Sequence, residues 1–600
     1  MSAPDDHVIG RAYDARLMRR LLGYLAPYRS AVVLAAVAIV GHACLQLVPP
    51  LLTKRVVDEE IPSGNLSGLG LVAALYLGTL VGSSTLEYVQ TWTMQMTGQR
   101  IMFDLRMAVF AHLHRLDIAY FDRNPVGRLM TRVTTDVDAL NELFTAGVVS
   151  IVGDVITLLG IMGVLLWLDW RLALVTFAVL PLLWWLTQWF RVHVRESYRT
   201  VRTWIARINA FLQERITGMA TVQLFGQEAR DFESFDAIDR AHRDANVDSI
   251  FYYAVFYPAV ELISALAVAL ILWVGGAGVE GGTLTLGALV AFVQYAQRFF
   301  RPISDMSEKF NVLQGAMASS ERIFALLDTP PGEGEGPSVV AAAPGPAGGG
   351  RIRFEDVTFS YVEGQPVLRH VSFEIEPGQR VAIVGATGSG KTTVANLLVG
   401  FYRAQSGRIT IDGRDVRAMD RPTLRSMFAL VPQEVHLFTG SIADNVRLGS
   451  SAMSDAQVRQ ALDAVHASTF VDRMPLGMQT MVTERGGSLS AGQKQLLSFA
   501  RALASGAPVL VLDEATSSVD TTTEVMIREA LAATGRGRTT IAIAHRLSTI
   551  QDMDRILVLH KGELRESGTH QELLALRGIY HRLHALQYGV GEAGSGGGGG

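Results

Sequence analysis

A glycine-rich run near the middle of the chain has the residue types and spacing of a loop that cradles phosphate. Gly385-Ala386-Thr387-Gly388-Ser389-Gly390-Lys391-Thr392 fits the pattern G-x-x-x-x-G-K-[ST]. Such glycines let backbone N–H groups converge on phosphate oxygens, and a helix that begins at the loop adds its partial positive charge. We expect Lys391 to reach the β- and γ-phosphates and the Thr392 hydroxyl to ligate Mg²⁺, with Thr393 completing the nucleotide contacts.

Four polar side chains elsewhere in the chain could complete a site for phosphoryl transfer. Asp513 is placed to hold Mg²⁺ through water, and Glu514 to polarise the attacking water. Gln433 is an amide that could touch both Mg²⁺ and this water, and His545 could hydrogen-bond the γ-phosphate. The plainer alternatives are a helix N-cap for the acidic pair, an ordinary loop glutamine, and a satisfied surface or core histidine.

The segments around these residues predict an α/β domain from Arg351 onward. Strands are expected at 351–359, 371–375, 380–384, 509–514 and 539–544, and a helix at 393–399. A strand, a glycine loop and a helix in succession distinguish a phosphate loop from a glycine turn with a chance lysine. Ligand groups at the C-terminal ends of strands suit an open α/β sheet.

The first half of the chain has the composition of a membrane domain. The chain has 600 residues, of which 49% are hydrophobic and 18% charged, and its mean hydropathy is +0.25. Six apolar segments, each near the ~20 residues that cross a bilayer, lie at about 30–52, 69–91, 143–168, 171–192, 250–277 and 284–301. Few charges lie inside them, which disfavours the alternative of buried core helices in a large soluble protein.

Basic residues predict the orientation of these segments. Arginines gather in the long stretches between spans 2 and 3 and between spans 4 and 5, whereas the opposite loops are short and poorer in positive charge. Both termini are therefore expected in the cytoplasm, with helices that continue past the membrane surface. Polar groups inside the spans either line a substrate pathway or bond between helices. They are Glu87, Asp154, Glu261, His42, Gln46 and Gln294.

Charge and cysteine content exclude other classes of protein. A net charge of −4 argues against nucleic acid as the main partner, and the single Cys44 excludes an intramolecular disulfide framework and a cysteine zinc site. The first 28 residues are polar and basic, so no cleavable signal peptide is expected. Residues 13–28 instead predict a basic amphipathic helix with one apolar face and three arginines near lipid headgroups. The face holds Leu17, Leu21, Leu22 and Leu25, and the arginines are Arg16, Arg19 and Arg20.

Composition also predicts where the domains begin and end. Residues 329–350 are rich in Pro, Gly and Ala and predict a flexible linker. The expected divisions are an N-terminal cytoplasmic helix at 1–29, a transmembrane domain with two cytoplasmic coupling regions at 30–328, this linker, a nucleotide-binding domain at 351–586 and a disordered glycine-rich tail at 587–600.

The segment Leu489-Ser490-Ala491-Gly492-Gln493 completes a set of motifs that resembles the ATP-binding cassette superfamily. The phosphate loop, Gln433, this signature, Asp513-Glu514, Ser518-Val519-Asp520 and His545 occur in that family's order and spacing. The signature separates the family from P-loop kinases, GTPases and other ATPases. The resemblance covers residues 351–586 and implies ATP and Mg²⁺ as ligands.

The resemblance implies roles that the residue types alone do not. Tyr361 would stack on adenine, and Ser490, Gly492 and Gln493 would bind the γ-phosphate held by a second nucleotide-binding domain. Asp520 would lie on the interface between the two domains. Thr483-Glu484-Arg485-Gly486 resembles a loop that contacts the coupling helices of exporters.

The apolar half resembles the membrane domain of a bacterial half-transporter of the multidrug and lipid exporter type. Residues 120–129, with Arg132 and Asp136, resemble the first cytoplasmic coupling region, and residues 211–218 and 225–228 resemble the second. The implied fold is an α-helical six-span transmembrane domain fused to an α/β P-loop nucleotide-binding domain, in the bacterial inner membrane. The implied partners are a second half-transporter, membrane lipid and a small hydrophobic or amphipathic substrate.

One residue departs from the family pattern, which has Gly where this chain has Ala491. A methyl group there crowds a backbone that must approach phosphate. In this position the chain resembles exporters that pair two different chains, in which one ATP site is competent and the other degenerate. Residues 138–144 and 495–501 also resemble the catalytically intact subunit of those pairs. We therefore expect a heterodimer in which Glu514 serves the competent ATP site. A homodimer that tolerates alanine is the alternative.

ATP-driven export of hydrophobic or amphipathic compounds is the function that these features predict. A lipid or lipid-conjugate flippase working as a homodimer shares the architecture and is the second candidate. A soluble ATPase acting on DNA or ribosomes would also carry the cassette, but six fused spans argue against it. No feature of the sequence favours an ATP-gated channel, and the motifs do not specify the substrate.

Overall fold

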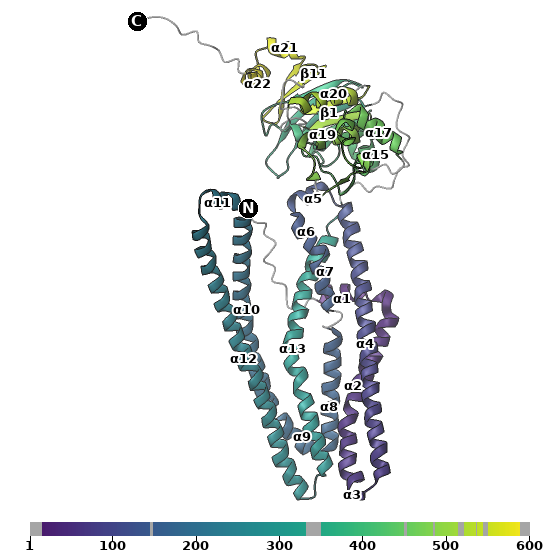
Figure 1. Cartoon of the computed structure of the whole chain (residues 1–600), viewed down its shortest axis with the longest axis vertical. Coiled ribbons are helices and arrows are strands. Elements are labelled where there is room, and N and C mark those ends of the chain that lie inside the picture. Colours follow the sequence, from purple (N-terminus) through teal and green to yellow (C-terminus); the bar gives the residue numbers. More distant parts are fainter. Residues whose placement is uncertain are drawn as a thin grey trace, which may run out of the picture. The chain divides into compact units, whose positions relative to one another are not determined.

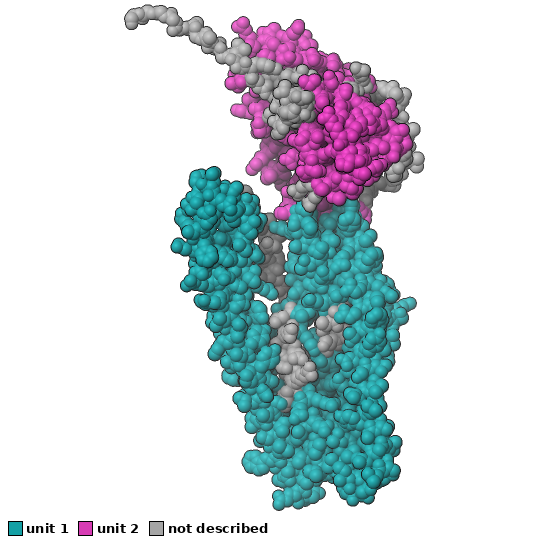
Figure 2. Space-filling model, viewed as in Figure 1, with its two compact units in different colours: residues 1–114, 126–329 teal, residues 115–125, 330–600 magenta. Residues whose placement is uncertain are grey.

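The computed structural model describes two compact parts of the chain, through residues 15–143, 148–331, 350–448, 453–483, 486–513, 521–535, 537–543 and 550–588. Unit 1 comprises residues 1–114 and 126–329, and unit 2 comprises residues 115–125 and 330–600 (Figure 2). The segment 115–125 thus lies within the transmembrane half of the sequence but packs with the second half.

Unit 1 is built from long helices (Figure 1). In chain order they are α1 Ala15–Gly23, α2 Arg29–Arg55, α3 Ile61–Ser63, α4 Leu66–Arg115, α6 Val126–Val133, α7 Thr135–Glu142, α8 Val148–Leu168, α9 Trp170–Phe177, α10 Leu180–Thr217, α11 Met219–Leu224, α12 Glu228–Glu280 and α13 Leu286–Leu327. Helices α4 and α12 contain 50 and 53 residues. They are much longer than the ~20 residues that a bilayer requires.

Five stretches of the described residues are long and apolar enough to cross a membrane. They are Ala26–Ser63, Leu66–Arg115, Ile151–Leu168, Trp170–Thr217 and Glu228–Glu280, and they overlap the first five predicted spans. The sixth predicted span forms the first part of α13, where Gln294, Gln297 and Arg298 lower the hydropathy. A total of six spans therefore stays a prediction.

The N-terminal helix and the fourth predicted span differ from their expected bounds. Helix α1 ends at Gly23, and its buried residues are Met18 and Leu21, whereas Leu22 is 45% exposed. Arg20, which we expected near lipid headgroups, pairs with Asp328 (Nη1 to Oδ2, 2.7 Å) and lies over the ring of Phe324. The fourth predicted span is interrupted between α9 and α10, where a proline in the first turn of α10 favours a new helix start.

Polar side chains inside unit 1 bond between helices. His42 Nδ1 of α2 lies 3.0 Å from the Ser83 carbonyl oxygen of α4, which can only accept a hydrogen bond, and Arg298 of α13 donates to the Gln46 carbonyl at 2.7 Å. Asp154 of α8 pairs with Lys309 of α13. For His42 and Asp154 the structure therefore supplies the interhelical bonding that was one of the two alternatives, whereas the Gln46 side chain contacts His42 within α2 (Nε2 to Nε2, 2.7 Å).

A buried carboxylate joins α7 to α13. Asp136 is 6% exposed and accepts hydrogen bonds from Arg322 Nε at 3.0 Å and Ser319 Oγ at 3.1 Å. Its neighbour Asp138 pairs with Arg106 of α4 at a far more exposed position. The short helix α7 is thus held to the long helices on both sides.

Unit 2 is the predicted α/β domain. Its strands are β1 Ile352–Phe359, β2 Leu368–Ile375, β3 Arg380–Val384, β4 Ser406–Ile411, β5 Arg414–Asp415, β6 Phe428–Val431, β7 Gly440–Ser441, β8 Met481–Val482, β9 Val509–Asp513, β10 Thr539–Ile543, β11 Arg555–His560 and β12 Glu563–Gly568. One sheet has the order β12-β11-β3-β10-β9-β6, parallel except for the edge strand β12. An antiparallel sheet has the order β2-β1-β4-β5, and β7 pairs with β8.

Strand β9 shows why a continuous apolar run predicted a strand buried on both faces. Val509 and Val511 pack in one core cluster with residues of β1, β2 and α14 (Lys391–Leu398). Leu510 and Leu512 pack in another with α16 (Ile442–Arg447), α17 (Asp455–Ala464) and α19 (Ala491–Ala504). Because both faces are covered, alternation of polar and apolar residues is absent. The remaining helices are α15 Arg421–Ser426, α18 Ser468–Val471, α20 Thr521–Gly535, α21 His570–Ala575 and α22 Ile579–Tyr588.

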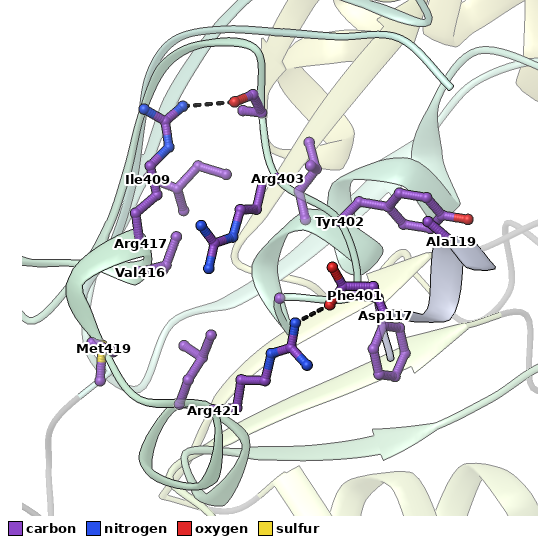
Figure 3. A pocket seen from close by; sticks show the side chains of 14 residues that line it. Asp117, Ala119, Phe401, Tyr402, Arg403, Ile409, Val416, Arg417, Met419 and Arg421 are labelled. Carbon is purple, nitrogen blue, oxygen red and sulfur yellow. Dashed lines mark hydrogen bonds and ion pairs between the residues drawn. The ribbon is translucent and has the colours of Figure 1, made fainter. Parts of the chain in front are cut away.

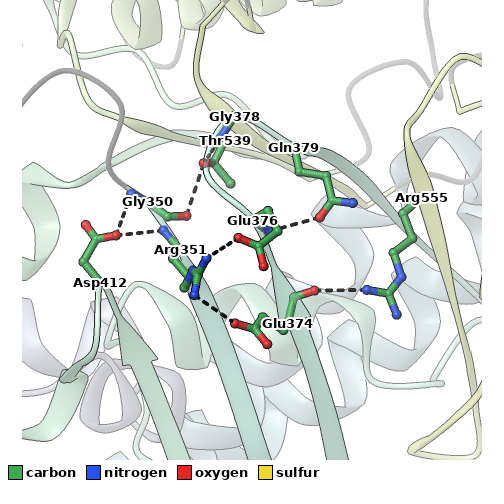
Figure 4. Close-up of polar contacts among 9 residues, drawn as sticks. All are labelled: Gly350, Arg351, Glu374, Glu376, Gly378, Gln379, Asp412, Thr539 and Arg555. Atoms are coloured by element: carbon green, nitrogen blue, oxygen red, sulfur yellow. Dashed lines mark hydrogen bonds and ion pairs between the residues drawn. The ribbon is translucent and has the colours of Figure 1, made fainter.

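Polar contacts join the two sheets where the chain enters unit 2 (Figure 4). Asp412 Oδ1 accepts the N–H groups of Gly350 and Arg351, both at 2.8 Å. Thr539 Oγ1 donates to the Gly350 carbonyl at 3.2 Å and accepts from the Gly378 N–H at 2.9 Å. Since Thr539 begins β10, these contacts lie at the opposite end of this strand from the predicted site.

Candidate functional site

The parallel strands of unit 2 bring the predicted site residues to one edge of the sheet. The glycine loop follows β3, Asp513 ends β9, and Gln433 comes two residues after β6. Ile543 at the end of β10 pairs with both Ile383 and Asp513, and Val431 pairs with Leu512. The C-terminal ends of these four strands are therefore level, and this is where open α/β sheets bind ligands.

The glycine loop packs too closely to carry side chains at two of its positions. A Cβ at Gly390 would lie 2.6 Å from Leu368 Cδ2, and a Cβ at Gly385 would lie 2.2 Å from the Leu559 carbonyl oxygen. Gly388 and Gly390 also have φ angles of 79° and 100°, which residues with side chains rarely adopt. The spacing of the glycines thus follows from the backbone that connects β3 to α14.

Two polar side chains of this loop fit a phosphate ligand. Lys391 is 6% exposed, and its Nζ donates to the carbonyls of Gly385 at 2.9 Å and Ala386 at 3.1 Å. These bonds hold the ammonium group against the loop. Ser389 Oγ is buried and has no hydrogen-bond partner within the described residues. An unpaired buried hydroxyl is unfavourable, and a phosphate oxygen in the loop would pair with it.

The end of β9 and the start of α14 place two oxygen groups side by side. Thr392 Oγ1 lies 3.5 Å from Asp513 Oδ1. A hydroxyl and a carboxylate are the kind of ligand that Mg²⁺ prefers, so these residues fit the predicted ion. Gln433 is exposed just beyond the neighbouring strand β6.

Tyr361 is fixed beside the helix that begins in the phosphate loop. Its hydroxyl donates to Thr393 Oγ1 at 3.2 Å and accepts from Asn396 Nδ2 at 3.3 Å. Its ring meets the rings of Phe359 and Tyr402 edge-on, with centroids 4.8 and 4.9 Å apart. An aromatic face is therefore held at the site rather than free to rotate.

The signature residues form the start of α19. Ser490 is the N-cap, its Oγ accepts from Gln493 N at 3.2 Å, and Gln493 Oε1 accepts from Ser490 N at 3.0 Å. This capping box leaves the positive end of the helix dipole at an exposed Ser490 and Ala491, with Gly492 buried behind them. None of the described hydrogen bonds joins these residues to the phosphate loop of the same chain.

Comparisons with known proteins identify the family. Residues 32–303 match the family model of the ABC transporter transmembrane region, and residues 368–517 match the ABC transporter model. An ATP-dependent lipid A-core flippase of Thiobacillus denitrificans is 36% identical, over 98% of this chain and 100% of its own length. The chain belongs to the ATP-binding cassette (ABC) transporter family. The predicted family and fold class are confirmed.

Further relatives narrow the kind of ABC transporter. A probable multidrug resistance ABC transporter ATP-binding/permease protein of Bacillus subtilis is 38% identical over 87% of this chain and 78% of its own length. The structure of a bacterial Atm1-family ABC exporter with ATP bound matches with a TM-score of 0.78 at 30% identity, covering 95% of this chain and all of that one. This ABC transporter is therefore a multi-pass membrane exporter that couples ATP hydrolysis to transport and works as a dimer of half-transporters.

The structure also shows contacts of the ABC transporter that the motifs did not predict. Tyr402 donates a hydrogen bond to Asp122, and Arg421 pairs with Asp117. Asp122 lies in the predicted first coupling region, but Tyr402 and Arg421 belong to no motif. Both residues lie between the phosphate loop and Gln433 in the sequence, but aromatic and basic residues are common in such a segment. Their position therefore did not identify them as contact residues.

Several predicted site residues fall outside the described residues. They are Glu514, His545 and Ser518-Val519-Asp520, together with Glu484 and Arg485 before the signature and Phe144 in the membrane half. For these residues the predicted roles continue to depend on the sequence motifs alone.

Proposed function

We propose that this ABC transporter exports hydrophobic or amphipathic compounds across the bacterial inner membrane, with unit 2 and both termini in the cytoplasm. The observation that carries the proposal is the presence, in one chain, of an apolar helical unit and of a sheet edge where Thr392 lies beside Asp513 and next to the buried Lys391. The B. subtilis relative is named for multidrug resistance, and this name supports the substrate class.

The residues at the sheet edge divide the chemistry of hydrolysis among them. Backbone N–H groups of Gly385 to Thr393 bind the phosphates, with Lys391 neutralising their charge. Thr392, Asp513 and Gln433 hold Mg²⁺, which supplies further charge neutralisation when bound. Glu514 takes the proton of the attacking water as general base, and His545 orients the γ-phosphate. Tyr361 presents its ring to adenine.

A second chain completes each ATP site. Ser490, Gly492 and Gln493 at the start of α19 bind the γ-phosphate that the partner holds, because a helix N-terminus favours an anion. ATP therefore stabilises the closed pair of nucleotide-binding domains, and hydrolysis releases it. The pair thus alternates between a closed and an open state, and the difference in nucleotide affinity between these two states drives the alternation.

The partner in this proposal is a different half-transporter. Ala491 adds a methyl group at the first position of α19, next to the backbone that must approach phosphate. A site formed with this signature is impaired, so the competent site uses the phosphate loop and Glu514 of this chain with the signature of the other. The rival is a homodimeric lipid or lipid-conjugate flippase, and the T. denitrificans relative named as a lipid A-core flippase favours it.

Reconstitution of the purified chain separates these possibilities. ATP-dependent uptake of a lipophilic dye into inside-out proteoliposomes, absent in Lys391→Ala, is expected for the multidrug proposal. Low ATPase activity of the chain alone, restored by a partner that lacks the catalytic glutamate, is expected for the heterodimer. Full turnover by the pure homodimer, stimulated by a fluorescent lipid that it moves between leaflets, would establish the flippase instead.

A further inference from the structure

Tyr402 lies between two features of unit 2 that are far apart in sequence. Its hydroxyl donates a hydrogen bond to Asp122 Oδ2 of α5 (Ile118–Arg123), and 280 positions separate the two residues. Its ring meets that of Tyr361 with centroids 4.9 Å apart and an interplanar angle of 88°. The Tyr402 side chain thus contacts both residues 115–125, which we call the coupling segment, and the aromatic residue proposed to bind adenine.

Helix α14 fixes both tyrosines on their other sides. Asn396 Nδ2 donates to the Tyr361 hydroxyl at 3.3 Å, and the Asn396 carbonyl accepts the N–H of Phe401 at 2.9 Å and that of Tyr402 at 3.4 Å. Gln405 adds two bonds to the Ser360 backbone, at 2.6 and 2.7 Å. The segments that carry Tyr361 and Tyr402 are therefore tied to one another and to the helix that begins at the phosphate loop.

A cavity beside α5 shows how the segment is held (Figure 3). This cavity of about 180 Å³ is lined by Asp117 and Ala119 from the coupling segment and by residues of 397–424 from the body of unit 2. Two of the lining residues attach the segment: Arg421 pairs with Asp117, and Tyr402 donates a hydrogen bond to Asp122. Of these two attachments, Tyr402 is the one that also contacts Tyr361.

The chemistry of the Tyr402 hydroxyl suits a permanent hydrogen-bond donor. Burial raises the pKa of Tyr402 well above its ordinary range, and the bond to Asp122 raises it further. The hydroxyl therefore keeps its proton, and the carboxylate accepts a charge-assisted bond. Edge-to-face ring contacts depend on orientation, and the Tyr361 ring is held in such a contact with Tyr402, so a base stacked on Tyr361 would bear on the position of the Tyr402 ring and on its bond to Asp122.

We propose that Tyr402 is a positioning residue that couples nucleotide occupancy at Tyr361 to the position of α5 through Asp122. The inference depends on the proposed function, because it requires that Tyr361 binds adenine. Coupling of this kind is reciprocal, so the hydrogen bond from Tyr402 to Asp122 also biases the nucleotide site according to the state of the coupling segment. Tyr402 does not touch the reacting phosphates.

Hydrogen–deuterium exchange of the full chain in lipid nanodiscs tests this coupling without a transported substrate. The probe is ATP with Mg²⁺ and orthovanadate, compared with no nucleotide. In the wild type we expect slower exchange both at 385–393 and at 115–125. In Tyr402→Phe, which keeps the ring, protection at 385–393 should remain, while the response at 115–125 falls about tenfold, as loss of one charge-assisted hydrogen bond predicts.

Further variants keep the test independent of the folding of Tyr402→Phe. Asp122 is exposed, so Asp122→Asn should fold and lose the same response, and Asp122→Glu should retain most of it. Tyr28→Phe removes another tyrosine hydroxyl that donates to an aspartate, Asp104, at 2.8 Å in unit 1. This matched control should respond like the wild type.

The outcomes separate this inference from the proposed function. A normal response at 115–125 in both Tyr402→Phe and Asp122→Asn overturns the inference and leaves the proposed function intact. Complete loss of protection at 385–393 in Tyr402→Phe at saturating nucleotide also overturns it, because reciprocal coupling only weakens binding and Tyr402 would then act within the nucleotide site. A wild type without protection at 385–393 overturns the proposed function, and the inference with it.

Discussion

Single side chains at the phosphate loop are arranged for a ligand more than for the stability of the fold. Lys391 is buried with two carbonyl acceptors, and Ser389 is buried with a hydroxyl that lacks a partner within the described residues. Natural proteins rarely leave buried polar atoms unpaired. A group that accepts the Ser389 hydroxyl on binding accounts for its retention, and predictions follow for both affinity and stability.

Replacing Ser389 with alanine should separate these two quantities. Without nucleotide, Ser389→Ala should unfold at the wild-type temperature or slightly above it, because an unpaired buried hydroxyl is removed. Its affinity for ATP should fall roughly tenfold, as expected for one hydrogen bond to a charged group. Thermal unfolding and a fluorescent ATP analogue measure both. Ser498→Ala, at another buried hydroxyl that has no hydrogen-bond partner among the described residues, should leave the affinity unchanged.

Glu514→Gln should distinguish binding from hydrolysis. The amide keeps the shape of the side chain but cannot take a proton from water, so ATP affinity should persist while turnover falls at least about a hundredfold. Nucleotide binding and phosphate release measure the two. Turnover near that of the wild type would exclude Glu514 as the general base.

At the scale of elements, short helices are held by a few polar side chains. Helix α7 has only eight residues, too few to be stable alone, and it is fixed through Asp136 to α13 and through Asp138 to α4. These carboxylates have similar partners but very different exposure. They form a natural comparison of a buried and an exposed attachment.

Asp136→Asn should destabilise unit 1 much more than Asp138→Asn. The first change leaves Arg322 without its buried carboxylate and should cost about 1–3 kcal/mol. The second affects a pair that is 41% and 65% exposed and should cost less than about 1 kcal/mol. Thermal unfolding in detergent gives the comparison. Equal effects would show that burial of Asp136 contributes nothing.

The end of unit 2 should respond to acid through His584 on α22. Burial lowers the pKa of His584 below its ordinary value of 6.5, and the neighbouring His570 and His581 lower it further. Because the folded state binds this proton less readily than the unfolded state, the stabilisation is present above pH 6.5 and is lost as the pH falls through the folded pKa. Protection factors at 563–588, in which exchange is corrected for its intrinsic dependence on pH, should therefore fall between pH 7.5 and 5.5 in the wild type, and less in His584→Gln.

The sequence predicted those elements whose pattern is local. Strand β3 begins and ends at the predicted residues, and β9 begins at the predicted Val509, because buried apolar runs and the glycine loop delimit them. Strand β2 begins at Leu368, three residues early, because Leu368 pairs with Phe359 of β1. The contact of Tyr402 with Asp122 spans 280 positions, and no local pattern encodes such a pair. The phosphate-binding residues were predictable because one motif holds most of them.

At the scale of the whole molecule, the proposed role of Ala491 concerns the dimer. Ala491 stands at the exposed first position of α19, where its methyl group is not buried in the fold of its own chain. The family membership establishes that two half-transporters act together. If the methyl group of Ala491 impairs the ATP site that it helps to form, the two half-transporters are different chains. If the site tolerates this methyl group, both can be this chain.

Ala491→Gly should raise the ATPase turnover of the purified chain alone. Removing the methyl group lets the backbone at the start of α19 approach phosphate, so both sites of a homodimer become competent. We expect an increase of at least about fivefold with little change in unfolding temperature, since glycine in the first turn costs roughly 1 kcal/mol or less. Unchanged turnover would indicate that the homodimer already tolerates alanine.

The assignment of residues 115–125 to unit 2 means that the polypeptide passes between the units three times, at 114/115, 125/126 and 329/330. A soluble fragment starting after residue 329 would therefore not be a whole folding unit. It would expose Tyr402 and Arg421 without Asp122 and Asp117, and the aromatic residues beside them would meet water. Biochemistry on such a fragment would describe a nucleotide-binding domain whose surface for residues 115–125 is exposed to water. We expect a peptide of residues 115–125 to bind to that surface.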